Sequence, residues 1–154
     1  MYRKIGSLST LILLGLIFGS ATEVFGAPPA CEVVDLKDVS ADAKKIDTGL
    51  ITATQSSWSK SFSAGQAAWV ILENGNVHVT PVVVRFTESV VDPKTGNPAT
   101  RVACESLVTV VPKVTVVIKH SVFGEKISYN LEVTLPDEPP IDSALIRITI
   151  KALL

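Results

Sequence analysis

Apolar and polar side chains alternate along much of the chain with a period of two residues. Every second residue is apolar in segment 127–135, and the same alternation returns in segment 144–150. This pattern is typical of strands that bury one face. The core is therefore expected to contain five residues from these two segments: Tyr129, Leu131, Val133, Ile146 and Ile148.

Shorter stretches of the same kind, separated by turn residues, divide the rest of the chain. The strongest turn signal is Asn74-Gly75, which predicts a hairpin because both residues tolerate positive φ. A single short helix is predicted at Val39–Lys45, with Ser40 as its cap. Strands are predicted near 31–36, 48–54, 58–63, 67–73, 76–87, 101–110, 114–121, 126–135 and 143–151.

About a third of the residues after position 26 are Val, Ile or Thr, which favour strands over helices. Eight or nine strands at short intervals predict an all-β fold, an antiparallel β-sandwich of immunoglobulin-like architecture. The likeness is architectural only. Trp58 and Trp69 come too late after Cys31, and Val102 occupies the position where immunoglobulin domains carry a tyrosine.

Residues 1–26 have the features of a secretory signal peptide. Arg3 and Lys4 precede an apolar run of eight residues, and small side chains follow that run. This order is typical of a cleaved leader. We expect the cleavage site between Ala21 and Gly26.

A single domain, 27–154, would remain after cleavage, and its length suits one hydrophobic core. No later apolar run is long enough to cross a membrane as a helix, so we expect no stable membrane span. The expected location is secreted, periplasmic or on the cell surface. A cut after Gly6 would instead retain the apolar run as the assembly helix of a pilin-like filament subunit, although glycines interrupt that run.

Composition and charge exclude two classes of protein. Hydrophobic residues make up 47% of the chain, which is too many for a disordered protein. The formal net charge is −1, so the chain lacks the basic surplus of a nucleic-acid-binding domain. We expect no nucleic acid among the partners.

Cys31 and Cys104 are the only cysteines. In an oxidising compartment, an even pair is most simply explained as a disulfide. The bond is expected to join the first strand to a central one. Metal-binding or redox thiols are the alternative, but no C-x-x-C spacing is present.

Few residues suggest catalysis or cofactor binding. His78 and His120 are the only histidines, and the only methionine is the initiator, so a copper site of the blue type is not supported. No hydrolase, metalloprotease or phosphate-loop motif is present. Glu88, Glu105 and other strand carboxylates would act together only if the fold paired them. We assign no catalytic residue, metal or cofactor.

Two regions are candidates for binding. Trp58, Phe62 and Trp69 lie close in sequence among small residues and could form a platform for a small ligand or carbohydrate. The last predicted strand ends the chain with few charges, so it could offer an open sheet edge to a partner strand. The residues of this second candidate are Ile146, Ile148, Thr149 and Ile150.

These observations favour a secreted, non-catalytic structural or protein-interaction module whose partner is another protein, or a second copy, bound through a sheet edge. The alternative is a ligand-binding domain that uses Trp58 and Trp69. An enzyme has the least support.

Overall fold

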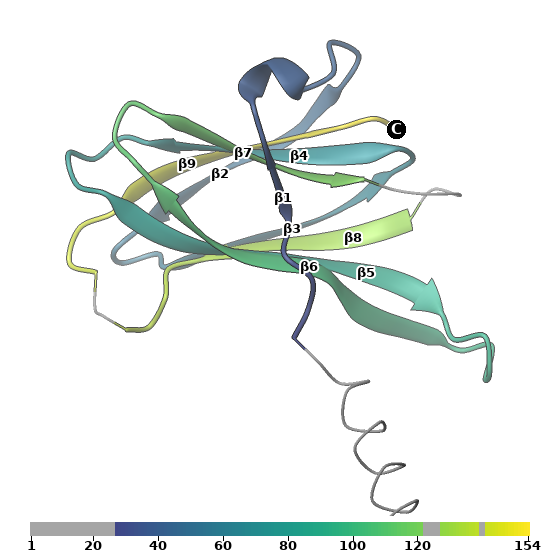
Figure 1. Ribbon diagram of the computed structural model, residues 1–154. Helices are drawn as coiled ribbons and strands as arrows, with labels where there is room; N and C mark the ends of the chain where they lie inside the picture. The colour runs from purple at the N-terminus through teal and green to yellow at the C-terminus, as the bar shows by residue number, and fades with distance from the viewer. Residues whose placement is uncertain (1–26, 122–126, 139–140) are drawn as a thin grey trace, which may run out of the picture.

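The structure, a computed structural model, describes residues 27–121, 127–138 and 141–154, so the expected signal peptide lies outside the described residues. Two antiparallel sheets pack face to face as the layers of a β-sandwich (Figure 1). Sheet A has the order β1 (Glu32–Val34), β7 (Thr115–Ser121), β4 (Ala67–Asn74), β9 (Leu145–Ala152) and β2 (Lys44–Thr52). Sheet B has the order β3 (Ser57–Ala64), β8 (Ile127–Thr134), β5 (Thr80–Val91) and β6 (Pro98–Val110). The predicted all-β sandwich is confirmed.

The core lies between the sheets and follows the period-two pattern. Sheet B contributes Leu131 and Val133 from β8, and sheet A contributes Ile146 and Ile148 from β9; all four are almost fully buried. Tyr129 is buried beside them. The five predicted core residues are confirmed, because alternation fixes which face of each strand turns inward.

A second, smaller apolar cluster covers the outer face of sheet A. Trp69, Ile71 and Val117 lie beneath a segment that contains a 3-10 helix, η3 (Leu36–Asp38). Val39 packs against this cluster. The helix predicted at Val39–Lys45 is wrong: the chain turns there, and Lys44 already begins β2, where backbone pairing with β9 replaces helical hydrogen bonds.

The predicted hairpin at Asn74-Gly75 is also wrong, because β4 and β5 belong to different sheets. The Asn74 side-chain amide donates to the carbonyls of His78 and Val110, at 2.8 and 2.7 Å. Gly75 N donates to Leu145 O at 2.8 Å. These bonds direct the chain across the sandwich instead of back along β4.

The last strand is an interior strand. β9 is hydrogen-bonded to β2 on one side and to β4 on the other. The proposed open edge at Ile146, Ile148, Thr149 and Ile150 is therefore wrong. The same β-branched alternation that suggested an edge instead fits a central strand, whose inward isoleucines are almost fully buried. The edges are β1 and β2 in sheet A, and β3 and β6 in sheet B.

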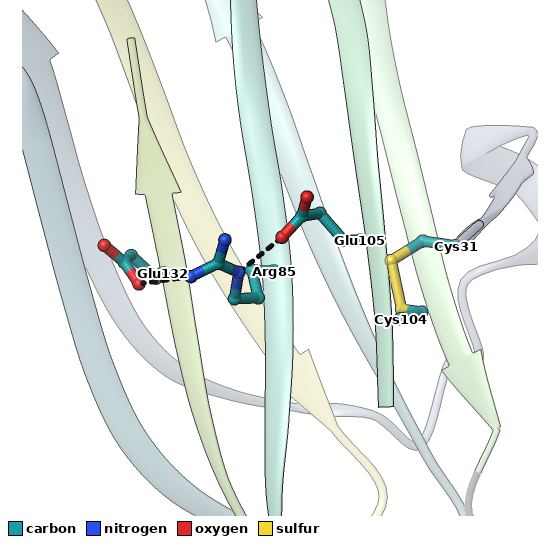
Figure 2. Close-up of polar contacts among 5 residues, drawn as sticks. All are labelled: Cys31, Arg85, Cys104, Glu105 and Glu132. Atoms are coloured by element: carbon teal, nitrogen blue, oxygen red, sulfur yellow. Dashed lines mark hydrogen bonds and ion pairs between the residues drawn. A yellow bond between two sulfur atoms is a disulfide. The ribbon is translucent and has the colours of Figure 1, made fainter. Parts of the chain in front are cut away.

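Cys31 and Cys104 form a disulfide, with their Cα atoms 5.0 Å apart. Figure 2 shows it at the side of the sandwich, where the segment entering β1 meets β6. The bond therefore joins edge strands of the two sheets. The expectation that its second cysteine lies on a central strand is wrong, since β6 pairs only with β5.

Candidate functional site

The three aromatic residues singled out in the sequence do not share a surface. Trp58 is half-buried and covers Gly49, where an added Cβ would overlap the indole ring. Phe62 is buried in the core between the sheets. Trp69 is only 3% exposed and belongs to the cluster on the outer face of sheet A. No common ligand platform forms from them.

A polar cleft instead opens between the sheets at one end of the sandwich. The inward series of β5 runs Val82, Val84, Phe86 and then Glu88. The residues paired with Glu88 on the neighbouring strands also carry polar groups: Arg101 on β6 and Tyr129 on β8. We define the polar cleft by its four titratable residues, which line a cavity of about 460 Å³: Glu88, Arg101, His120 and Tyr129.

The carboxylate of Glu88 is the most buried charge of the cleft. Its side chain is 7% exposed and forms an ion pair with the Nε of Arg101, whose side chain is 69% exposed. Burying an unpaired carboxylate would be costly. Arg101 therefore neutralises Glu88 while leaving much of its own guanidinium toward the opening.

Aromatic rings form the wall beside this ion pair. The His120 ring stacks on Phe86 with centroids 5.5 Å apart, and it meets the Tyr129 ring edge-on at 5.3 Å. Burial lowers the pKa of His120, opposed by the negative charge of Glu88. Burial, together with Glu88, raises the pKa of Tyr129 to about 12. At neutral pH the cleft thus presents a neutral imidazole and a protonated phenol.

Only a weak signal in the sequence indicates this cleft. Glu88 interrupts the alternating apolar series of β5 at a position that faces inward. This interruption is the sign of a polar site that could be detected in the sequence. Nothing local to the sequence relates Glu88 to His120 or Tyr129, which lie on other strands. The remaining histidine, His78, is exposed in the loop between β4 and β5.

Other strand carboxylates meet on the outer face of sheet B. Arg85 forms an ion pair with Glu105 and lies 4.0 Å from Glu132 (Figure 2). All three side chains are partly exposed. This ladder is a cross-strand charge pairing on a solvated face. Within the part of the chain that the structure describes, no group of three or more His, Cys, Asp or Glu is placed to hold a metal ion.

The free edge of β3 is a second candidate site. Leu135 N donates to Ser56 O at 2.8 Å, so these residues form a hydrogen-bonded pair at the start of the β3–β8 ladder. The register then continues unbroken over eight pairs. Because hydrogen-bonded and non-bonded pairs alternate in an antiparallel ladder, four residues direct their backbone N–H and C=O groups away from β8: Ser57, Ser59, Ser61 and Ser63.

The corresponding groups on the other edges are interrupted. In β2, Thr48 N donates to the Asp47 side chain at 2.8 Å, Thr52 N donates to Gln55 O at 3.0 Å, and the register shifts before Asp47. Such irregularities protect an edge from pairing. For β3, by contrast, no described residue forms a backbone hydrogen bond on the outer side, and Lys60 is its only charge.

The β1–β6 side is blocked in its middle. Glu105 N donates to Pro29 O at 2.9 Å, and Cys31 N donates to the Ser106 hydroxyl at 2.8 Å. The disulfide fixes this segment against β6, and β5 and β6 also shift register near Thr87. β1 itself has three residues. Among the described strands, β3 therefore offers the longest uninterrupted row of outward backbone groups.

Comparison with known protein families, curated proteins and solved structures finds no match. The structure shows an antiparallel β-sandwich with one internal disulfide. Among the described residues, no helix has the length and apolar character needed to cross a membrane.

Proposed function

We propose that the protein is a non-catalytic, extracytoplasmic interaction module that binds an extended segment of another protein along β3. The observation that carries this proposal is the row of outward backbone groups on Ser57, Ser59, Ser61 and Ser63. A strand added to this edge would extend sheet B by β-augmentation.

The main chain would supply most of the affinity. Each backbone hydrogen bond contributes about 0.5–1.5 kcal/mol net, and four outward residues can each donate one bond and accept one. The serine side chains lie on the outer face and leave room beside the backbone. Selectivity would come from contacts with Trp58 and Lys60, whose side chains alternate with those serines.

The compartment is part of the proposal. The structural disulfide fits an oxidising environment outside the cytoplasm. A cleaved leader at residues 1–26 would direct the chain there.

The test compares two proline variants at outward amides. Ser61→Pro removes one N–H from the β3 edge, and Leu107→Pro removes one from β6, where alternation from Glu105 directs it outward. Neither change removes a backbone hydrogen bond of a sheet, although Ser61→Pro also removes the side-chain hydrogen bond from Ser61 Oγ to Asn130 Oδ1. Proteins of the source envelope and culture fluid are captured on each variant and on the wild type, after unchanged melting temperatures show that the variants fold.

The proposal expects a partner that is captured by the wild type and by Leu107→Pro but lost with Ser61→Pro. Hydrogen exchange should show that the partner protects the amides of Ser57, Ser59, Ser61 and Ser63. Equal capture by both proline variants, or unprotected β3 amides in the complex, would overturn the proposal. A dimer in light scattering that Ser61→Pro abolishes would identify a second copy as the occupant, and would overturn the assignment to a different protein.

A further inference from the structure

The polar cleft occupies positions where the register of the sandwich calls for apolar residues. Val82, Val84 and Phe86 precede Glu88 on the inward face of β5 and are fully buried. A carboxylate at the next inward position costs desolvation energy that a leucine would not. Stability does not explain Glu88, and polar groups gathered in a cavity are typical of a binding site.

The groups of the cleft keep unused hydrogen-bonding capacity. The ion pair joins Glu88 Oε1 to Arg101 Nε, which leaves Glu88 Oε2 and the terminal nitrogens of Arg101. Within the described part of the chain, the bond from Arg101 Nε to Glu88 Oε1 is the only side-chain hydrogen bond found for the four residues of the cleft. A negative and a positive group therefore lie side by side, next to a neutral imidazole and a phenol.

We propose that the polar cleft binds a small zwitterion of the α-amino-acid type. The ligand's ammonium group would donate to Glu88 Oε2 and to His120, and its carboxylate would accept from the terminal nitrogens of Arg101. In an α-amino acid the ammonium and carboxylate groups are close together, and in the cleft the carboxylate of Glu88 and the guanidinium of Arg101 are also close together. The two dipoles can therefore lie side by side in antiparallel orientation.

Ligands of a single charge fit the cleft less well. An anion on Arg101 would lie next to the buried Glu88 carboxylate, and like charges in a poorly solvated site repel strongly. A cation on Glu88 would compete with Arg101 and would gain nothing from its terminal nitrogens. Unlike a ligand with a single charge, a zwitterion pairs an opposite charge with each member of the ion pair.

The size and wall of the cleft suit such a ligand. A volume of about 460 Å³ lies within the range of small-molecule sites. The rings of His120 and Tyr129 line the cavity, and aromatic faces attract an ammonium group. The cleft lies between the sheets and apart from the outward backbone row of β3, so this inference stands independently of the proposed partner.

The experiment measures binding of the proteinogenic amino acids, one at a time, to the purified protein by isothermal titration calorimetry. Propionate and propylamine serve as probes with one charge each. Glu88→Gln and Arg101→Gln each remove one member of the ion pair. Arg85→Gln, which breaks the comparable ion pair on the outer face, is the matched control.

We expect saturable binding of at least one amino acid, at least tenfold weaker binding of propionate and propylamine, and at least tenfold weaker binding by Glu88→Gln and Arg101→Gln. Arg85→Gln should bind as the wild type does. The absence of binding by every amino acid at millimolar concentration would overturn the proposal. Propylamine or propionate binding as tightly as any amino acid would overturn it in favour of a simple cation or anion site.

A second measurement does not depend on the variants. The ligand should shift the ring resonances of His120 in the nuclear magnetic resonance spectrum of the wild type and leave those of exposed His78 unchanged. Equal shifts of both histidines, or none, would place the ligand outside the cleft and contradict the proposal.

Discussion

Cutting the disulfide should remove a large part of the folding free energy. Cys31 and Cys104 are separated by 73 positions, so the bond closes a long loop in the unfolded chain. In the chain-entropy treatment, a disulfide that closes a loop of this length in the unfolded chain stabilises the native state by about 4 kcal/mol. That loss is comparable to the whole stability of a marginal domain, which is about 5–15 kcal/mol.

The structure leaves little to compensate for this loss. Apart from the disulfide, the entering segment is fixed to sheet B by the Pro29–Glu105 backbone hydrogen bond and by the bond from Cys31 N to Ser106. β1 adds three pairs with β7. Two hydrogen bonds of about 1 kcal/mol each keep the segment docked only weakly. We therefore expect both a global loss of stability and faster hydrogen exchange along β1.

Urea denaturation of the oxidised wild type, the reduced wild type and the double variant Cys31→Ala/Cys104→Ala measures the effect. The reduced protein keeps both side chains, so it isolates the covalent bond from the packing of the sulfur atoms. Ser106→Ala is the control for the local hydrogen bond and should cost about 1 kcal/mol. A difference below about 1 kcal/mol between oxidised and reduced protein would refute the loop-closure reasoning, as would two free thiols in the unfolded, unreduced chain.

Further predictions test the core and the titrating groups. Leu131→Ala should destabilise the fold by about 3–5 kcal/mol, because this side chain is fully buried on an interior strand; a loss below about 1 kcal/mol in urea denaturation would contradict its position. Gly49→Ala should cost about 1–3 kcal/mol by overlap with Trp58, and in a Trp58→Ala background the same change should cost much less. In a chain that begins at residue 27, Tyr129 is the only tyrosine, and absorbance titration should give it a pKa of about 12. Because the phenol of the unfolded chain ionises near pH 10, the unfolding free energy should fall as the pH rises above 10. Ionisation of Tyr129 near pH 10 in the folded protein would contradict its burial. The lowered pKa of His120 means that the unfolded state binds more protons below pH 6.5, so the unfolding free energy should decrease on acidification through that value; an identical pH dependence in His120→Gln would contradict this assignment.

Strand content and the inward face were predictable because both are local properties. Alternation in segment 127–135 gave the buried set of β8, and it did not depend on knowing which strand lies next to it. The cysteine pair could be assigned because the chain contains no other cysteine. In these cases a few neighbouring residues, or a simple count, carry the information.

Sheet order was not predictable, since it depends on contacts between residues far apart in the sequence. Asn74-Gly75 resembles a hairpin turn, yet Asn74 bonds to Val110 from β6 and the chain crosses to the other sheet. Ser143–Leu154 ends the chain, yet β9 inserts between β2 and β4. The polar cleft has the same origin, because Glu88, His120 and Tyr129 meet only through pairing of distant strands.

The contacts around β3 explain why this edge is both open and well ordered. The disulfide and the Pro29 contact lie on the β1–β6 side, whereas β3 lies beside β2 on the opposite side of the sandwich. There, Trp58 packs on Gly49 and Lys60 forms an ion pair with Asp47 at 2.8 Å. These side chains fix β3 against β2 without using its outward backbone groups. A partner strand would therefore meet an edge that is already ordered, and binding to a preorganised edge loses less conformational entropy than binding to a mobile one.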